Sequence, residues 1–257
     1  MVERYKRGKG KKSLLGSHQK CWIWGRNLVC ETLAAGRWPI RDLFLSAALA
    51  EDVRRTAAAR AAELNVPVNV REPGELERLS HTAEHQGYLA RMEEFPYRSW
   101  AEIPVSAMPF YAMADGIQDP FNLGAILRSA EVFGADAAIL PLAGGVGVTS
   151  MVARSSAGAV NRLPLIRVES LGAAAAALAS RGVTVVGASE KAKRELSACD
   201  LKRPVCIVVG NEGVGLSAAM LAHCAETVRI PQQGHVGSLN AAVAAGIFFY
   251  EVRRQRA

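Results

Sequence analysis

The sequence predicts an α/β protein with a smaller N-terminal domain and a C-terminal domain built on a parallel sheet. From residue 110 onwards, short apolar runs without polar alternation recur, as expected for strands that are buried on both faces of such a sheet. Helical segments with readable ends separate these runs, and alternation of strands and helices is typical of an α/β sheet domain. With 257 residues, half of them hydrophobic, the chain is long enough to bury a sizeable core.

The chain begins with a strongly basic segment over residues 1–17. The formal net charge is +7, and six lysines and arginines stand among residues 1–12 against one acid, Glu3. We expect a disordered tail that contacts the phosphates of a nucleic acid; a merely solubilising end is the alternative. The segment lacks the apolar stretch of a signal peptide, and the longest apolar run, residues 241–250, is too short to cross a membrane. These features predict a soluble, cytoplasmic protein without a membrane partner.

Residues 18–95 are expected to form the smaller α/β domain, because helical and strand patterns alternate over the length of a usual domain. The expected elements are a helix over 22–36 that ends at Gly36, a strand over 40–46, an amphipathic helix over 50–65, a strand over 66–71, a small helix over 73–80 and a strand over 87–95. Residues 96–109 contain three prolines and no clear periodicity, which favours a linker.

Residues 110–257 form the second predicted domain. Asp119 and Pro120 suit the N-cap and first turn of the helix that follows its first strand, and Gly134 ends that helix. Ser170 caps a second helix, which ends at Gly182. The strands are expected over residues 110–115, 137–140, 164–168, 183–189, 204–210 and 226–230.

Ligands of such sheets bind beyond the carboxyl ends of the strands, and three unusual stretches fall there. The first, residues 115–135, contains a helix in which Arg128 lies off the apolar face and Asn122 lies near the start. The alternatives are a solvated arginine and an asparagine that completes a turn. The apolar face consists of Leu123, Ile126, Leu127, Ala130 and Phe133.

The second stretch, residues 208–217, reads VVGNEGVGLS. Its three glycines permit positive φ and a close backbone approach, and Glu212 stands where an acid is unfavourable without a partner. A plain tight turn is the alternative. The third stretch, residues 230–240, leads into an apolar helix that is expected to start near Ser238, with Asn240 in its first turn. Free backbone N–H groups there suit a ligand, whereas an ordinary N-cap at Ser238 needs none.

Three further patterns are weaker indications of function. Residues 144–150, GGVGVTS, partly match the dinucleotide fingerprint, but Ser150 replaces the third glycine and no hydride-transfer site accompanies it. Five cysteines without a CxxC pair disfavour disulfides and a zinc knuckle. His81 and His85 stand four apart and suit one helix face, but no third ligand is in view, so hydrogen bonding is expected and no metal site.

In this order and spacing, the three stretches resemble the three motifs of the SpoU (TrmH) family of RNA 2'-O-methyltransferases, within the SPOUT superfamily. The resemblance covers residues 110–251, and the N-terminal part, with HQGYLA near its end, resembles the L30e-like substrate-binding domain of the branch that methylates a guanosine ribose in 23S rRNA. The matching residues are Asn122, Gly124 and Arg128 in the first motif, Gly210, Asn211, Glu212 and Gly213 in the second, and Ile230, Pro231, Ser238, Leu239 and Asn240 in the third.

The resemblance implies a deep trefoil knot near the C-terminus, a homodimer, and S-adenosylmethionine bound in the knot. The cofactor-binding residues that it implies are Gly210, Asn211, Gly213, Ile230 and Leu239, and the catalytic residues are Asn122, Arg128, Glu212, Ser238 and Asn240. Because arginine stays protonated at pH 7, we expect a charged Arg128 that binds a substrate phosphate and stabilises a developing alkoxide. Glu212 would orient Arg128 or Asn122, and Ser238 and Asn240 would fix the loop.

The expected activity is S-adenosylmethionine-dependent 2'-O-methylation of a ribose in RNA, with 23S rRNA as the substrate that the resemblance implies. A tRNA 2'-O-methyltransferase is one alternative. A non-catalytic RNA-binding or ribosome-assembly factor of the same fold is another, which the intact motif residues disfavour.

Overall fold

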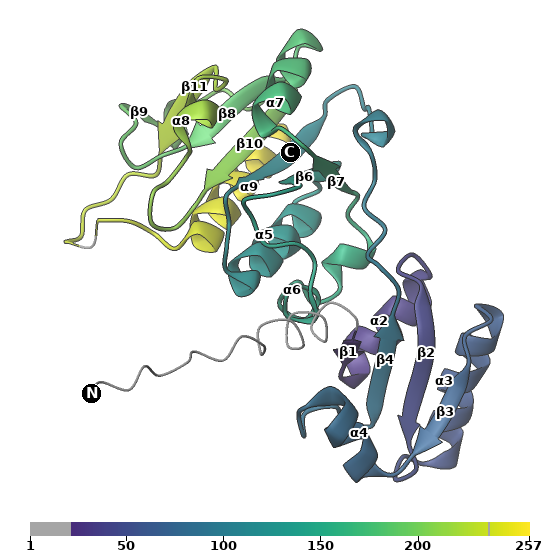
Figure 1. The fold of residues 1–257 in the computed structure, drawn as a ribbon. Helices are drawn as coiled ribbons and strands as arrows, with labels where there is room; N and C mark the ends of the chain where they lie inside the picture. Colours follow the sequence, from purple (N-terminus) through teal and green to yellow (C-terminus); the bar gives the residue numbers. More distant parts are fainter. Residues whose placement is uncertain (1–21, 236) are drawn as a thin grey trace, which may run out of the picture.

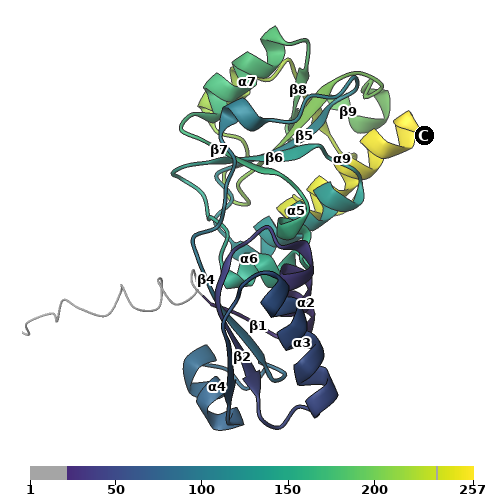
Figure 2. The ribbon, with the colours of Figure 1, turned by 90° about the vertical axis from the view of Figure 1, so that its right-hand side faces the viewer.

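The computed structural model describes residues 22–235 and 237–257, and these residues form two β-sheets, each with its own helices (Figure 1). The four-stranded sheet belongs to the N-terminal domain and the seven-stranded sheet to the C-terminal domain. The two domains are stacked end to end, and helix α6 (Ser150–Ser155) lies at their junction (Figure 2). The predicted basic tail, residues 1–17, lies outside the described residues.

The N-terminal domain is a mixed sheet with α2 and α3 on one face and α4 on the other (Figure 2). The strand order is β1-β4-β2-β3, in which only β2 and β3 are parallel. Its elements are β1 (Trp22–Trp24), α2 (Arg26–Ala35), β2 (Ile40–Ser46), α3 (Glu51–Glu63), β3 (Val68–Arg71), α4 (Pro73–Ser80) and β4 (Tyr88–Met92).

The helix predicted over residues 22–36 is wrong in its first three residues, which form β1. Gly25 separates this strand from α2 with a φ of 95°, a conformation that residues with a side chain rarely adopt. Strand β1 is stabilised by antiparallel pairing with β4, at the far end of the domain, which local periodicity does not reveal. Gly36 ends α2 in the left-handed conformation, as predicted.

Residues 96–109, the predicted linker, lie along the C-terminal sheet. Arg98 forms a parallel bridge with Ile166, and the Tyr97 hydroxyl accepts a hydrogen bond from the Val148 amide at 2.6 Å. A short 3-10 helix, η1 (Trp100–Glu102), follows, and Ile103 is buried. This segment therefore packs as part of the C-terminal domain, although its prolines deprive it of a regular period.

The C-terminal sheet is parallel throughout, in the order β7-β6-β5-β10-β8-β11-β9. Every strand predicted from the sequence is present; β9 and α6 are not among the predicted elements, because they are too short to show a period. The strands are β5 (Phe110–Asp115), β6 (Ala137–Pro141), β7 (Leu165–Val168), β8 (Thr184–Ala188), β9 (Arg194–Glu195), β10 (Val205–Gly210) and β11 (Glu226–Arg229). The helices besides α6 are α5 (Pro120–Val132), η2 (Ala159–Asn161), α7 (Leu171–Ser180), η3 (Leu196–Ala198), α8 (Ala218–Leu221) and α9 (Ala241–Arg256).

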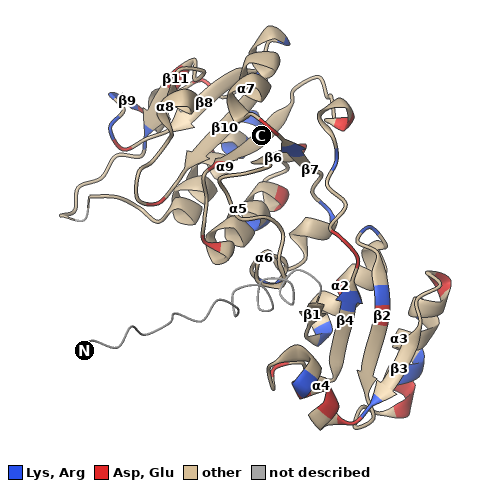
Figure 3. Ribbon diagram, in the orientation of Figure 1, with Lys and Arg blue, Asp and Glu red and all other residues tan. Residues whose placement is uncertain are grey.

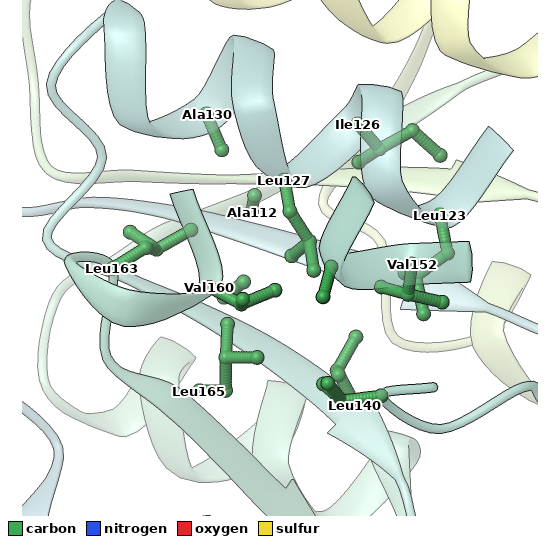
Figure 4. Close-up of a cluster of buried hydrophobic side chains, with 14 of the residues drawn as sticks. Ala112, Leu123, Ile126, Leu127, Ala130, Leu140, Val152, Val160, Leu163 and Leu165 are labelled. Atoms are coloured by element: carbon green, nitrogen blue, oxygen red, sulfur yellow. The ribbon is translucent and has the colours of Figure 1, made fainter. Parts of the chain in front are cut away.

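Helix α5 packs its predicted apolar face into the core beside β6, β7 and α6 (Figure 4). Leu123, Ile126, Leu127 and Ala130 are buried, whereas Phe133, just past the helix end, is half-buried. Asp119 caps the helix by accepting hydrogen bonds from the amides of the first turn, as predicted. This cap and the buried face together fix the orientation of the first turn of α5.

We expect Gly124→Ala to destabilise the protein, because α5 and α6 are in close contact at Gly124. A Cβ atom there would overlap the Ser155 hydroxyl and lie 2.7 Å from the Val152 carbonyl oxygen, so backbone must shift. Overpacking of this kind costs about 1–3 kcal/mol, which lowers Tm by roughly 2–10 °C in thermal unfolding. Gly246→Ala is the control, since its Cβ would meet only the Ser129 hydroxyl at an ordinary 3.6 Å. An unchanged Tm for Gly124→Ala would contradict the tight contact.

Polar contacts join the two domains. The buried Asn161 amide donates a hydrogen bond to the Thr32 hydroxyl at 3.0 Å, and Arg162 forms an ion pair with Glu31, also at 3.0 Å. A second ion pair of the same length links Arg154 of α6 to Glu84 of the N-terminal domain. Elsewhere, charged residues lie mostly on the outer surfaces, for example along α3 and α4 and around β9 (Figure 3).

The described part of the chain contains no helix that is both long and apolar enough to span a membrane. Within the same residues, no group of three or more His, Cys, Asp or Glu side chains is arranged to hold a metal ion. His81 and His85 do not share a helix face, because α4 ends at Ser80; His85 instead accepts a hydrogen bond from the Gly87 amide at 3.0 Å. The described cysteines, Cys30, Cys199, Cys206 and Cys224, are free thiols, and Cys21 lies outside the described residues.

Candidate active site

A cavity opens at the carboxyl ends of β8, β10 and β11, where a ligand site of a parallel sheet is expected. Its walls come from the turns that follow these strands and from the start of α9. All the predicted cofactor-binding residues line it, together with Glu212 and Ser238 of the predicted catalytic set. The lining residues are Ala188, Ser189, Glu190, Val209, Gly210, Asn211, Glu212, Gly213, Gly215, Ile230, Gln232, Ser238, Leu239, Ala241, Ala244 and Phe248.

Asn211 holds the turn after β10 in shape. Its backbone exchanges two hydrogen bonds with Gly215, and its side-chain oxygen accepts one from the Gly213 amide at 2.8 Å. Its side-chain nitrogen donates to the Gly116 carbonyl at 2.9 Å, which ties the turn to the end of β5. Both ends of the Asn211 side chain are therefore engaged within the protein, and the residue shapes the cavity wall.

Three predicted catalytic residues form one chain of hydrogen bonds. The Asn122 side-chain nitrogen donates to the Glu212 carboxylate at 2.6 Å, and the Asn122 oxygen accepts from the Asn240 side-chain nitrogen at 2.9 Å. The residues come from α5, from the turn after β10 and from the residue before α9, which are far apart in the sequence. Asn122 is thus fixed at both ends, and the Glu212 carboxylate, although exposed, is held by this bond.

The predicted start of the last helix is wrong. Helix α9 begins at Ala241, and Asn240 is its N-cap, because the Asn240 side-chain oxygen accepts hydrogen bonds from the Ala242 and Val243 amides at 2.9 and 3.2 Å. Asparagine is as good a cap as the expected Ser238, and the hydrogen bond from Asn240 to Asn122 also holds Asn240 at this position. Ser238 is exposed at the cavity wall and makes no hydrogen bond within the described part of the chain.

Arg128 lies apart from this hydrogen-bond chain. It is exposed on α5, and it has no ion pair, hydrogen bond or ring contact among residues 22–235 and 237–257. Of the two residues that Glu212 is predicted to orient, only Asn122 is hydrogen-bonded to it. Arg128 follows Asn122 by six residues, a spacing that places the two on different sides of the helix. Its guanidinium is free to contact a group from outside this chain.

Several cavity residues were not predicted from the sequence. Ser189 and Glu190 follow β8, Gln232 follows β11, and Phe248 comes from the buried face of α9. For Ser189, Glu190 and Gln232 the signal is the one that identified the other stretches, a position just beyond a strand end. Phe248 lies within α9 and has no such signal. Asp115, at the end of β5, also contributes, because its carboxylate accepts a hydrogen bond from the Ser217 amide at 2.7 Å and so fixes the far end of the glycine turn.

The cysteines near the site are not activated thiols. Burial, with a smaller contribution from the Asp115 carboxylate, raises the pKa of the Cys224 thiol to about 11. Burial also raises the pKa of Cys206, which lies inside β10. Both groups are protonated at neutral pH, and a protonated thiol is a poor nucleophile, so neither suits covalent catalysis.

Polar groups of the glycine-rich segment 144–150 form hydrogen bonds within the protein. The Val148 amide donates to the Tyr97 hydroxyl, and the Thr149 side chain caps α6 by accepting a hydrogen bond from the Val152 amide at 3.3 Å. Helix α6 has only six residues, and protein groups already take up amides at its start. The partial dinucleotide fingerprint therefore finds no structural support.

Comparison with known proteins agrees with this geometry. Residues 109–250 match the model of the SpoU rRNA methylase family, and residues 22–98 match that of the RNA 2'-O ribose methyltransferase substrate-binding domain. The 23S rRNA (guanosine-2'-O-)-methyltransferase RlmB of Pseudomonas putida is 34% identical over 241 residues, which cover 91% of this chain and 96% of that protein. An uncharacterized tRNA/rRNA methyltransferase of Mycobacterium ulcerans is 36% identical over 239 residues, covering 91% of this chain and 77% of that protein.

The solved structures agree at the level of the fold. The SpoU methyltransferase AviRb of Streptomyces viridochromogenes, crystallised in complex with AdoMet, superposes with a TM-score of 0.79 at 28% identity, over 96% of this chain and 94% of that one. One family accounts for the parallel seven-stranded sheet, the separate N-terminal domain and both family-model matches. The chain belongs to the SpoU family of RNA methyltransferases and has the SPOUT fold with an N-terminal substrate-binding domain.

Proposed function

We propose that this protein transfers the methyl group of S-adenosylmethionine to the 2'-oxygen of a ribose in RNA, with a guanosine of 23S rRNA as its substrate in the cytoplasm. The observation that carries the proposal is the hydrogen-bond chain from Glu212 through Asn122 to Asn240, which stands at the rim of the cavity beyond the sheet. Family membership and the similarity to RlmB of Pseudomonas putida support the reaction and the substrate class.

The cavity fits S-adenosylmethionine in its chemistry. Apolar side chains of Ile230, Leu239 and Phe248 offer walls for an adenine ring, and Ser189, Glu190 and Gln232 offer polar groups for ribose hydroxyls and the amino acid end. Its volume is about 150 Å³, below the roughly 300–1,000 Å³ of usual ligand sites. We therefore expect the exposed residues 231–235 and 237–240 to move outward when the cofactor enters.

The bound cofactor would supply a sulfonium methyl group that is already activated for displacement. The ribose 2'-oxygen forms the new bond to carbon while the sulfur–carbon bond breaks, and the hydroxyl proton passes to water. The charged guanidinium of Arg128 binds a substrate phosphate and stabilises the developing alkoxide. Asn122, held rigid by Glu212 and Asn240, positions the nucleotide, since preset orientation lowers the barrier.

The proposed enzyme is a homodimer with a trefoil knot. Helix α9 packs against α5 and β10, and membership of the SpoU family supports the knot. Along α9, Val243, Ile247 and Tyr250 stay 51%, 37% and 52% exposed, although the opposite face of the helix is buried. An apolar stripe at helical spacing that this chain leaves uncovered supports burial against a second copy.

We expect Ile247→Arg to convert the dimer into a monomer, because a charge would be buried at the centre of the stripe. Size-exclusion chromatography with light scattering measures the change directly. Leu221→Arg is the matched control, since Leu221 is a comparably exposed apolar residue on α8 and should leave the mass unchanged. A monomeric parent protein, or a dimer that survives Ile247→Arg, would refute this interface.

The activity is tested by incubating the purified protein with radiolabelled S-adenosylmethionine and either rRNA or tRNA from cells that lack it. We expect label in 23S rRNA, in a nucleotide that resists alkaline cleavage because its 2'-oxygen is methylated. Label in tRNA alone would overturn the proposal that 23S rRNA is the substrate. Tight cofactor binding with no methyl transfer to any RNA would overturn the proposed reaction and favour a non-catalytic RNA-binding factor.

A further inference from the structure

We propose that a second cavity, between the two domains, binds an unpaired guanine base of the RNA close to the methylated nucleotide. The inference rests on the proposed RNA methyltransferase activity but concerns a different site. This interdomain cavity measures about 450 Å³ and is separate in its lining from the cavity beyond the sheet. Its lining includes Trp24, Asn27, Glu31, Glu84, Gln86 and Arg154.

The partly exposed Arg154 guanidinium offers a stacking plane, and the buried Trp24 ring lies behind it. The Arg154 guanidinium lies over the Trp24 ring, 5.4 Å from its centroid, while the same group is paired with Glu84 at 3.0 Å. Trp24 belongs to β1 and Arg154 to α6, so this arrangement exists only where the two domains meet. Proteins hold unpaired RNA bases on aromatic rings and on arginine planes in this way.

The Trp24 ring also has an unmet hydrogen bond. Its indole Nε1–H is buried and finds no acceptor among the described residues. Buried donors without a partner are uncommon in native proteins and call for an explanation. A nucleobase carries carbonyl and ring-nitrogen acceptors, so a base bound at this ring supplies the chemistry that the protein leaves open.

The polar groups of the cavity suit the edge of a base rather than a phosphate. Glu31 and Glu84 each use one carboxylate oxygen in an interdomain ion pair, which leaves the other oxygen free to accept. The exposed Asn27 side chain makes no hydrogen bond within residues 22–235 and 237–257. Carboxylates repel phosphates but accept N–H groups, and guanine presents two adjacent N–H donors on one edge.

The rim of the cavity has backbone in an unfavourable conformation. Gln86 and Ala157 both line it, with φ angles of 52° and 49°. Residues with a β-carbon rarely adopt positive φ, and such residues are concentrated at functional sites. The surrounding structure therefore keeps two residues of this cavity in an unfavourable backbone conformation.

The position of the cavity suits a base near the reacting ribose. The Ser155 hydroxyl, one residue after Arg154, donates to the Pro120 carbonyl at 3.2 Å. Pro120 begins the helix turn that carries Asn122, so the cavity and the catalytic hydrogen-bond chain adjoin the same end of α5. One RNA strand can therefore reach both sites within a short length.

The test measures RNA affinity by fluorescence anisotropy, using the full chain and a labelled nine-residue oligouridylate with one central guanosine. We expect Arg154→Ala to weaken binding at least tenfold and Asn27→Ala severalfold, as loss of a stacked and hydrogen-bonded base predicts. Replacing the guanosine by adenosine should lower the RNA affinity of the parent protein. With the adenosine oligonucleotide, the parent protein and Asn27→Ala should then have the same RNA affinity. Arg37→Ala is the matched control, because the Arg37 guanidinium also links the two domains, by donating to the Arg162 carbonyl oxygen at 2.5 Å, but neither residue lines the cavity.

Two outcomes would overturn the inference. Equal losses in Arg154→Ala and Arg37→Ala would show that these contacts only hold the two domains together. An RNA affinity that is the same in all variants, or the same for guanosine and adenosine, would show that no base enters the cavity. The assay contains no S-adenosylmethionine, so it is independent of methyl transfer. Guanosine binding without any transfer would reject the proposed activity alone, whereas full transfer with unchanged RNA affinity in Arg154→Ala would reject the cavity alone.

Discussion

Replacing Arg128 by alanine should lower methyl transfer to RNA by at least about 100-fold, the usual cost of removing a group that stabilises charge in the transition state. The affinity for S-adenosylmethionine and the Tm should remain nearly unchanged. Arg128 is exposed, has no partner in the described part of the chain and does not line the cofactor cavity, so its removal breaks no internal contact. Transfer rates, calorimetric cofactor titration and thermal unfolding of the same preparation separate these effects.

Arg128→Lys should fail almost as completely, because a point charge does not reproduce the planar fork of a guanidinium. Arg253→Ala is the matched control: Arg253 is also an exposed arginine on a helix of the C-terminal domain, and its side chain is likewise unpaired among the described residues. Full activity in either Arg128 variant would remove this residue from the mechanism. Loss of activity in the Arg253 variant as well would show that general positive charge, and not Arg128, is required.

Replacing Gly210 by valine should weaken S-adenosylmethionine binding by at least about tenfold and lower the Tm as well. The clash that causes both losses lies within the protein. A Cβ at Gly210 would lie 2.5 Å from the Gly215 carbonyl oxygen and from the Leu216 amide nitrogen, both of them backbone atoms. The turn that forms the cavity wall must therefore open, at an overpacking cost of about 1–3 kcal/mol or more.

Gly213→Ala is the control for this prediction. Gly213 lines the same cavity, but its Cβ would meet only the Asn211 side-chain oxygen, at an ordinary 3.5 Å. We expect its cofactor affinity to stay within a few-fold of the parent value, as measured by calorimetry on the folded protein. If the valine variant bound S-adenosylmethionine normally, the cofactor would have to bind somewhere other than the cavity beside Gly210.

Local pattern was sufficient for most of the fold. The buried strands of the C-terminal sheet were predicted because their apolar runs reflect burial on both faces, and the Asp119 and Ser170 caps because short polar side chains satisfy free amides. The errors fall where a distant partner decides the outcome. Strand β1 depends on pairing with β4, and residues 96–109 are ordered through contacts such as Arg98 with Ile166.

For the site, the sequence by itself determined which residue types stand after the strand ends, because parallel strands bring their carboxyl ends to one edge. Only the tertiary structure decided the pairing among them. It joined Glu212 to Asn122 and Asn122 to Asn240, and it left Arg128 unpaired, since hydrogen bonds form between side chains that meet in space and carry no local sequence period. The same holds for the interdomain cavity, whose Trp24 and Arg154 are brought into contact by the packing of two separately patterned domains.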